Sequence, residues 1–162
     1  MGRQGVQPLR RQELIGAAIE AIHDFGYCDV TVSQIARRAG VSPALALHYF
    51  GSKEHLLAET MRHLLTELSR EVGGRLATAH TPRARISAIV AGNFGGAQFR
   101  PSVISAWLAF YLQAQSGQTA YRLLRIYSRR LHSNLLHELC ELAEREHAIR
   151  IARGTAALID GL

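Results

Sequence analysis

Residues 31–50, TVSQIARRAGVSPALALHYF, constrain the fold more than any other stretch of this chain. They predict two short helices separated by a tight turn, because apolar positions 32, 35, 36 and 39 share one helical face. Gly40 can adopt the left-handed conformation that ends a helix without strain. Ser42 and Pro43 then start the second helix, since serine is a good N-cap and proline suits the first helical position.

The second of these helices has two different faces. Ala46 and Phe50 are four residues apart, so both can point back at the first helix. This layout is typical of a helix-turn-helix unit whose second helix enters a DNA major groove, although an ordinary helical hairpin in a bundle has the same spacing. The side chains left on the remaining surface are Ala44, Leu45, Leu47, His48 and Tyr49.

The residues that follow favour the DNA-binding alternative. Ser52 can cap a further helix, which places Lys53 in its first turn. A cation is unusual there, because the helix dipole favours anions. A phosphate at this helix start would explain both the lysine and the exposed amide groups.

Composition and periodicity predict an all-α protein. The 162 residues are 48% hydrophobic, contain four prolines and show no alternating strand pattern. No apolar run approaches the ~20 residues of a membrane span, and the N-terminus lacks the apolar core of a signal peptide. Cys28 and Cys140 are far apart, which suits a reducing compartment without disulfides. We therefore expect a cytoplasmic protein with no membrane association.

The periodic segments suggest two domains. Residues 1–52 form the N-terminal domain, with its first helix over 10–25 and an apolar stripe that includes Phe25. Residues 53–162 form a C-terminal helical domain, and the helix that begins at Lys53 links the two. The further expected helices are 53–79, 83–94, one from Pro101, 119–145 and 146–162.

The charge of the chain gives only loose support for an anionic partner. The net charge is +6, from 19 basic and 13 acidic residues. Most of this excess lies downstream, since residues 1–55 carry a net charge of only +1 (six basic against five acidic residues). Arg3, Arg10 and Arg11 fit a phosphate-binding arm and a solvated basic segment equally well.

Catalytic and metal-binding patterns are weak. His137 and Glu141 lie four residues apart on one face, but no compact ligand motif accompanies them. No glycine-rich phosphate loop and no nucleophile with a base can be recognised. We therefore expect no metal, no cofactor and no enzymatic activity.

The helix-turn-helix segment resembles the DNA-binding domain of the TetR family of bacterial repressors. After a threonine, the matching positions in order are Ile35-Ala36, Ala39-Gly40-Val41-Ser42, Tyr49-Phe50, Lys53-Glu54 and Leu56-Leu57. The resemblance continues to the BetI subgroup through AWLAF at 106–110, SRRL at 128–131 and ALIDGL at 157–162. That subgroup represses choline-to-glycine-betaine genes and responds to choline. Relatives continue through a further helix, so we expect this chain to be truncated at its C-terminal end.

The resemblance implies a homodimer on palindromic double-stranded operator DNA. Tyr49, Lys53 and Ser42 would contact phosphate, and His48 would reach a base edge. The apolar side chains of the second helix would contact thymine methyl groups, so part of the specificity would come from DNA shape. The expected DNA-binding residues are Thr31, Ser33, Gln34, Ser42, Ala44, Leu45, Leu47, His48, Tyr49 and Lys53.

The resemblance also implies a site for choline, a quaternary ammonium that aromatic faces and a carboxylate can hold. Asp160 would face the cation and Asn93 would bind the hydroxyl, although aromatic residues at helical spacing also fit an ordinary core. The candidate residues are Asn93, Phe94, Trp107, Phe110, Tyr111, Tyr127 and Asp160. Two alternatives stay open: a TetR-like repressor for a different lipophilic or cationic molecule, and a helical protein–protein interaction module.

Overall fold

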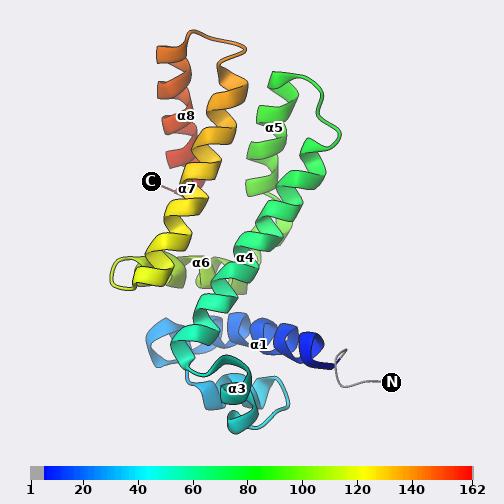
Figure 1. Cartoon of the computed structure of the whole chain (residues 1–162), viewed down its shortest axis with the longest axis vertical. Helices are drawn as coiled ribbons and strands as arrows, with labels where there is room; N and C mark the ends of the chain where they lie inside the picture. Colours follow the sequence, from blue (N-terminus) through cyan, green and yellow to red (C-terminus); the bar gives the residue numbers. More distant parts are fainter. Residues whose placement is uncertain (1–5, 162) are drawn as a thin grey trace. The chain divides into compact units, whose positions relative to one another are not determined.

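The computed structural model describes residues 6–161, and side chains from residue 9 onward; Arg3 of the predicted arm lies outside this range. The described residues form helices and no strand, as expected of an all-α protein (Figure 1). No described helix combines the length and the apolar character needed to cross a bilayer. The elements are α1 (Val6–Asp29), α2 (Val32–Arg38), α3 (Pro43–Phe50), α4 (Lys53–Leu76), α5 (Pro82–Asn93), a 3-10 helix η1 (Gly96–Phe99), α6 (Pro101–Ala114), α7 (Gln118–Leu139) and α8 (Arg145–Asp160).

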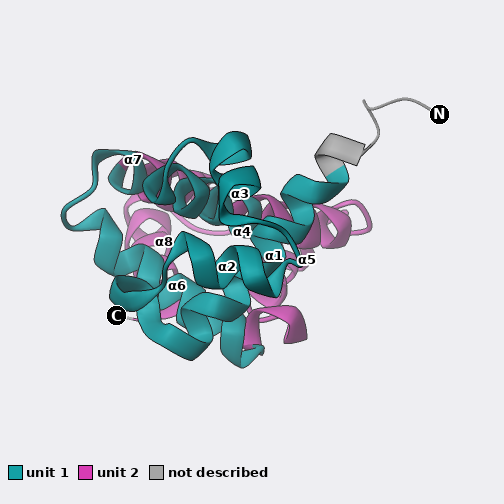
Figure 2. Cartoon of the chain, turned by 90° about the horizontal axis from the view of Figure 1, so that it is seen from below, with its two compact units in different colours: residues 1–64, 100–121 teal, residues 65–99, 122–162 magenta. Residues whose placement is uncertain are grey.

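The chain divides into two compact units (Figure 2). Unit 1 comprises Met1–Leu64 and Arg100–Tyr121, and unit 2 comprises Leu65–Phe99 and Arg122–Leu162. Helix α4 begins in unit 1 and ends in unit 2, while α6 belongs with α1, α2 and α3. The predicted boundary between residues 52 and 53 divides the chain by function, and it stays a prediction.

Unit 1 is built on α1, which packs against α2 and α6. Its buried stripe meets the back of the helix-turn-helix segment in one apolar cluster. Gly26, with φ 77° and ψ 161°, interrupts α1 where the sequence predicted an end. Phe25 is 43% exposed, so its expected place in the core is wrong. The larger side chains of the core are Leu14, Ile15, Ile22, Val30, Ile35, Phe50, Leu56 and Leu57.

In unit 2 the second half of α4 runs beside α5, and α7 runs beside α8 (Figure 1). The core consists of leucines on α7 that face small residues on α8. Alanine has no side chain beyond Cβ, so α8 can approach α7 closely. The buried residues are Ile89, Leu131, Leu135, Leu139, Ala148 and Ala152.

The predicted helix over 119–145 is too long. Helix α7 ends at Leu139, residues 140–144 turn, and Glu144 takes an extended conformation (φ −57°, ψ 147°) before α8 begins. The turn contains neither glycine nor proline, so no local breaker marks it. The chain reverses here because Ala148 and Ala152 must be buried against α7.

Candidate DNA-binding surface and effector cavity

The start of α2 is closed by a reciprocal cap. Thr31 is extended (φ −115°, ψ 156°), and its Oγ1 accepts a hydrogen bond from the Gln34 amide at 3.2 Å. The Thr31 amide in turn donates to Gln34 Oε1 at 2.7 Å. These bonds satisfy amide groups that a helix start leaves open. Thr31 therefore caps α2, Ser33 is exposed beside it, and DNA contact at these residues stays a prediction.

The turn and α3 also follow the predicted pattern. Gly40 has φ 66°, and the Val41 amide donates to the Ala36 carbonyl at 2.9 Å. Ser42 Oγ accepts from the Leu45 amide at 3.2 Å, which caps α3. Because the turn is tight and the cap is satisfied, the orientation of α3 on α2 is fixed.

The two faces of α3 differ sharply in burial. Ala46 and Phe50 are 1% and 2% exposed, so they hold the helix by its back. Ala44, Leu47 and His48 are exposed, whereas Leu45 and Tyr49 are partly buried. The His48 and Tyr49 rings meet edge-on with centroids 5.9 Å apart. The outward surface is mostly apolar and nearly neutral.

Lys53 has a structural partner inside the chain. Its Nζ donates to the Cys28 carbonyl at 3.2 Å, and Ser52 Oγ caps the same helix by accepting from the His55 amide at 3.1 Å. Cys28 lies near the end of α1, where helix carbonyls favour a cation. This contact explains the unusual lysine without a phosphate, so the predicted phosphate contact at Lys53 depends on the family resemblance alone.

The pKa values of two residues, Glu54 at the start of α4 and Tyr27 near the end of α1, differ from their ordinary values. Hydrogen bonds from its own backbone amide and from the Ser52 hydroxyl lower the pKa of Glu54. Burial raises the pKa of Tyr27, and the negative charge of Glu54 raises it further. The Tyr27 shift follows from the close approach of the start of α4 to the end of α1, whereas the Glu54 shift arises within the start of α4 itself.

Arg10 and Arg11 both have partners within unit 1. The Arg11 guanidinium lies 4.8 Å from the centroid of the Phe50 ring and 3.2 Å from Glu59 Oε2. Arg10 pairs with the neighbouring Glu13 at 2.7 Å. The sequence did not indicate the Arg11 contacts, because its partners are distant along the chain. A free phosphate-binding arm is therefore a poor description of Arg10 and Arg11.

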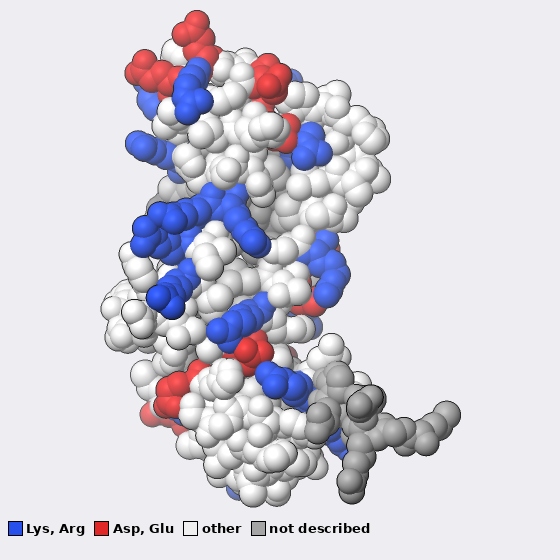
Figure 3. Space-filling model, viewed as in Figure 1, with Lys and Arg blue, Asp and Glu red and all other residues white. Residues whose placement is uncertain are grey.

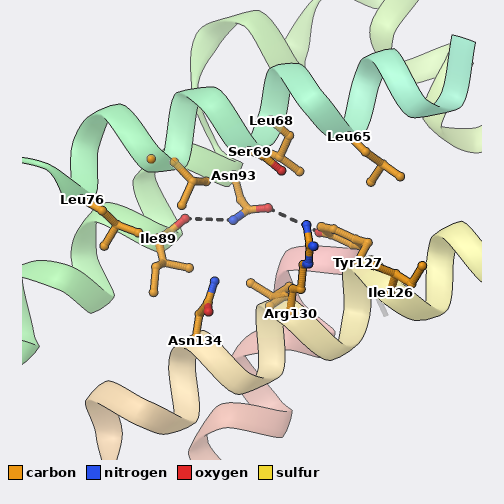
Figure 4. A pocket seen from close by; sticks show the side chains of 13 residues that line it. Leu65, Leu68, Ser69, Leu76, Ile89, Asn93, Ile126, Tyr127, Arg130 and Asn134 are labelled. Atoms are coloured by element: carbon orange, nitrogen blue, oxygen red, sulfur yellow. Dashed lines mark hydrogen bonds between the residues drawn. The ribbon is translucent and has the colours of Figure 1, made fainter.

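Unit 2 contains a cavity of about 290 Å³ between the second half of α4, α5 and α7 (Figure 4). Apolar walls with a few polar groups are typical of sites for small molecules. The lining side chains on α4 are Leu65, Leu68, Ser69, Val72 and Leu76. The others include Ile89 and Asn93 on α5, and Ile126, Tyr127, Arg130, Leu131 and Asn134 on α7.

Three of the predicted ligand residues meet at this cavity or directly behind its wall. The Tyr127 hydroxyl lies 3.0 Å from Asp160 Oδ1 and 3.3 Å from Asn93 Oδ1. Asn93 Nδ2 donates to the Ile89 carbonyl at 2.9 Å, which fixes the orientation of the amide. Figure 4 shows Asn93 reaching from α5 toward Tyr127 on α7. The sequence named these residues but not their hydrogen bonds.

The other predicted ligand residues lie elsewhere in the fold. Trp107, Phe110 and Tyr111 contact one another on α6 in unit 1, with ring centroids 5.8 to 6.3 Å apart. Phe110 is fully buried there. Phe94 is 47% exposed and stacks on Phe99 at 6.2 Å. The predicted residues are thus divided between the two units, and a shared aromatic cage stays a prediction.

Several residues that line the cavity were not predicted from the sequence. Ile126, Arg130 and Asn134 recur every four residues on α7, so helical periodicity was the signal that could have found them. A second cavity of about 270 Å³ shares Asn134 and ends at the pair between Arg85 Nε and Glu138 Oε1, 2.6 Å apart. The two hollows therefore adjoin along α7.

Basic side chains gather over α7 on the face shown in Figure 3. The exposed arginines of this helix are Arg122, Arg125, Arg129 and Arg130. The positive charge of the chain is therefore concentrated in unit 2, and it is not evidence for DNA binding by α3.

An exposed helix held on a helix-turn-helix frame, joined through α4 to a hollow helical unit, defines the class of ligand-responsive DNA-binding regulators. Two family models match the chain: bacterial regulatory proteins of the tetR family over residues 14–60, and the C-terminal part of BetI-type transcriptional repressors over 82–162. The HTH-type transcriptional regulator BetI of Brucella anthropi is 56% identical over all of this chain and 84% of its own. The BetI regulator of Agrobacterium fabrum is 52% identical over all of this chain and 79% of its own.

Solved structures share the fold. A transcriptional regulator from Pseudomonas aeruginosa PAO1 has a TM-score of 0.83 and 28% identity, covering 95% of this chain and 77% of that one. A regulator from Saccharomonospora viridis in complex with choline has a TM-score of 0.79 and 21% identity, covering 93% and 81%. The chain belongs to the TetR family of transcriptional regulators, and within that family it is of the BetI repressor type. The predicted family and fold class are confirmed, and the protein is a regulator, not an enzyme.

Proposed function

We propose that this chain acts as a homodimer on a palindromic operator of choline-to-glycine-betaine genes, and that choline weakens its hold on the DNA. The observation that carries the proposal is the 56% identity to BetI regulators over the whole chain, which includes the cavity as well as the DNA-facing helices. The choline complex of the S. viridis regulator adds only that this fold can hold choline, since its identity is 21%.

The burial of α3 supports a role in reading DNA. Its back is held by Ala46 and Phe50, which are buried, whereas Ala44, Leu47 and His48 are exposed on the other face. The apolar side chains can contact thymine methyl groups, while Ser42, Tyr49 and Lys53 would contact phosphates of the DNA backbone. Two such helices in a dimer would read half-sites about one helical turn apart.

Exposed apolar side chains on unit 2 support the dimer. Ile151 is 47% and Leu158 is 73% exposed, and their spacing of seven residues places them on one face of α8. Ile126 on α7 is 51% exposed. A two-fold symmetric contact would remove these side chains from water.

The continuity of α4 supports coupling between ligand and DNA. The helix begins three residues after α3 ends, and it carries Leu65, Leu68 and Val72 along the cavity. A ligand that moves these side chains therefore acts on α4, the helix that directly follows α3 in the chain. A hundredfold loss of operator affinity requires only ~2.7 kcal/mol of coupling.

The test is fluorescence anisotropy on DNA from upstream of the gene, with and without choline. Specific binding that choline weakens, and that the uncharged isostere 3,3-dimethylbutanol does not, would support the proposal. Specific binding whose affinity choline does not change would support a repressor that responds to a different effector. Absence of specific binding by a folded dimer would favour the protein–protein interaction module.

Trp107→Leu should abolish the choline response and retain the fold if Trp107 belongs to the site.

A further inference from the structure

A long segment of this chain carries positive charge without any negative charge. Residues 72–137 contain eight arginines and no aspartate or glutamate. Four of these arginines lie on α7 and are exposed, on the helix over which basic side chains gather in Figure 3. These four form the arginine stripe: Arg122, Arg125, Arg129 and Arg130.

The arginine stripe has no counter-charge within the part of the chain that the structure describes. Seven arginines elsewhere pair with carboxylates, whereas none of the four stripe arginines forms an ion pair with a described residue. Glu138 is the one acidic residue of α7, and it is buried in its pair with Arg85 at 2.6 Å. The stripe therefore presents four positive charges that an external anion can neutralise.

The spacing of the stripe fits a row of phosphates. Arg122, Arg125 and Arg129 follow one another at intervals of three and four residues, so they lie on one face of α7. The helix rises about 10 Å from the first of them to the last. One strand of duplex DNA presents a phosphate per about 3.4 Å of axis, so this length faces about three phosphates. Guanidinium groups bind phosphate oxygens in a planar, bidentate geometry.

We propose that the arginine stripe binds the phosphate backbone of duplex DNA, independently of base sequence, as a second DNA contact besides α3. The two surfaces are separate, because α3 belongs to unit 1 and the stripe to unit 2. Contacts to phosphate hold a protein on DNA without reading its sequence. A regulator whose α3 has left its operator would therefore stay on DNA through the stripe.

The test is fluorescence anisotropy of the full chain with a duplex that lacks any operator, between about 50 and 200 mM salt. The stripe variant carries Arg122→Gln, Arg125→Gln and Arg129→Gln, and it keeps Arg130 because that residue lines the cavity. The slope of log affinity against log salt should fall by about 2.7 for each stripe engaged, or 0.9 for each arginine. An unchanged slope would overturn the inference.

The matched control removes the same charge from α4 and α5 of the same unit. It carries Arg70→Gln, Arg75→Gln and Arg83→Gln, three exposed positions outside the cavity lining. Its salt slope should equal that of the wild type. An equal fall in both variants would show that only the net charge matters, and it would overturn the inference. Neither measurement needs an operator, so the result stands even if the proposed operator binding fails.

A second measurement separates the two sources of the phosphates. If a dimer on an immobilised operator captures a labelled non-operator duplex, and the stripe variant does not, the stripe binds a second duplex. If a longer operator fragment binds the wild type more tightly than a short one, and the stripe variant shows no such gain, the stripe binds flanking DNA. Absence of both effects in a wild type that binds its operator would place the contacts at α3 and overturn the inference.

Two other partners for the stripe would give different results. Ile126, which lies among these arginines, is 51% exposed and was assigned above to the dimer contact. If sedimentation velocity shows that the stripe variant is monomeric, the stripe belongs to the contact between subunits and the inference is wrong. The inference is equally wrong if the wild type binds phosphatidylserine vesicles through the stripe while its salt slope on DNA equals that of the variant.

Discussion

The DNA-facing helices and the cavity are held together in different ways. In α2 and α3 the caps join residues three positions apart, such as Thr31 with Gln34 and Ser42 with Leu45. At the cavity, hydrogen bonds join residues 33 and 34 positions apart, and about 290 Å³ stays open between the helices. The first region is a closed and locally determined surface, and the second is an assembly of separate helices around a space.

This difference indicates where regulation can act. A closed core resists change, because repacking it costs several kcal/mol. A space lined by three helices can take an occupant at a lower cost, and one of those helices is α4. We therefore expect α3 to be a fixed reading surface and unit 2 to be the responsive part. Four predictions test this contrast.

The largest effect is expected for Phe50→Ala. Phe50 is 2% exposed, fills the core of unit 1 and lies under the Arg11 guanidinium. Its removal leaves a cavity and should lower the free energy of unfolding by about 3–5 kcal/mol. Urea unfolding followed by circular dichroism measures this change.

Leu47→Ala is the matched control on the same helix. Leu47 is 42% exposed, so this change should alter stability by no more than about 0.5 kcal/mol while it weakens operator binding. A comparable loss of stability in the two variants would contradict the separation of α3 into a buried and a reading face.

Gly92→Ala tests the packing beside the cavity. A Cβ at this position would lie 2.7 Å from Val72 Cγ2 and 3.0 Å from Val72 Cα, so α4 or α5 must shift. This overpacking should cost about 1–3 kcal/mol, partly offset by the higher helix propensity of alanine. Because Val72 also lines the cavity, choline affinity should change as well. Unfolding and calorimetric titration measure the two effects.

Gly154→Ala serves as its control in α8, where a Cβ would meet nothing within 4 Å. This variant should gain about 0.5–1 kcal/mol from helix propensity alone. If Gly92→Ala is equally stabilised, α4 and α5 are free to separate and the close contact has no role in coupling.

The contrast also explains what the sequence could predict. Thr31, Gly40, Ser42 and Ser52 have their partners within five residues, so turn and capping rules placed α2, α3 and the start of α4 correctly. The turn at residues 140–144 was missed, because it results from burial of α8 on α7 and not from a local breaker.

Long-range contacts set the rest of the site. The bond from Lys53 to the Cys28 carbonyl spans 25 residues, and the contact of Arg11 with Glu59 spans 48. The spacing of apolar residues along one helix gives no information about contacts between residues so far apart in the sequence. The aromatic residues of α6 were predicted as ligand contacts from the family resemblance, because composition cannot separate core from ligand contact. Phe110 is fully buried, and a role of these residues in binding a ligand stays a prediction. The sequence therefore predicted the DNA-facing surface better than the cavity.

Lys53→Met separates a structural lysine from one that binds phosphate. The sequence contains no other lysine. If Lys53 meets a phosphate, the variant should bind the operator up to about tenfold more weakly, and the slope of log affinity against log salt should fall by about 0.9 per subunit. Loss of the exposed bond to Cys28 should cost less than about 1 kcal/mol of stability.

A footprint on the native protein provides a second measurement. An amine-reactive reagent should acylate Lys53 in the free protein, and operator DNA should protect it in mass spectrometry. An unchanged salt slope together with full acylation on DNA would show that Lys53 only ties α4 to α1.

The smallest effect is expected at Glu54, beside Lys53 at the start of α4. Hydrogen bonds from its own amide and from Ser52 hold the pKa of Glu54 below its ordinary value of 4.5. The folded state therefore binds this proton less readily than the unfolded state does. Its contribution to stability is complete above pH 4.5 and is lost as the pH falls through the lower, folded-state pKa.

Glu54→Gln removes the titrating group and keeps the shape of the side chain. The wild type should be slightly more stable than the variant at pH 7, and this difference should shrink as the pH falls below 4.5. Urea unfolding of both proteins between pH 3 and pH 7 measures it. Because the bonds involve only residues 52 and 54, the effect should persist when choline is bound. A difference that changed with choline would place the start of α4 in the responsive part of the molecule and would break the contrast between the two regions.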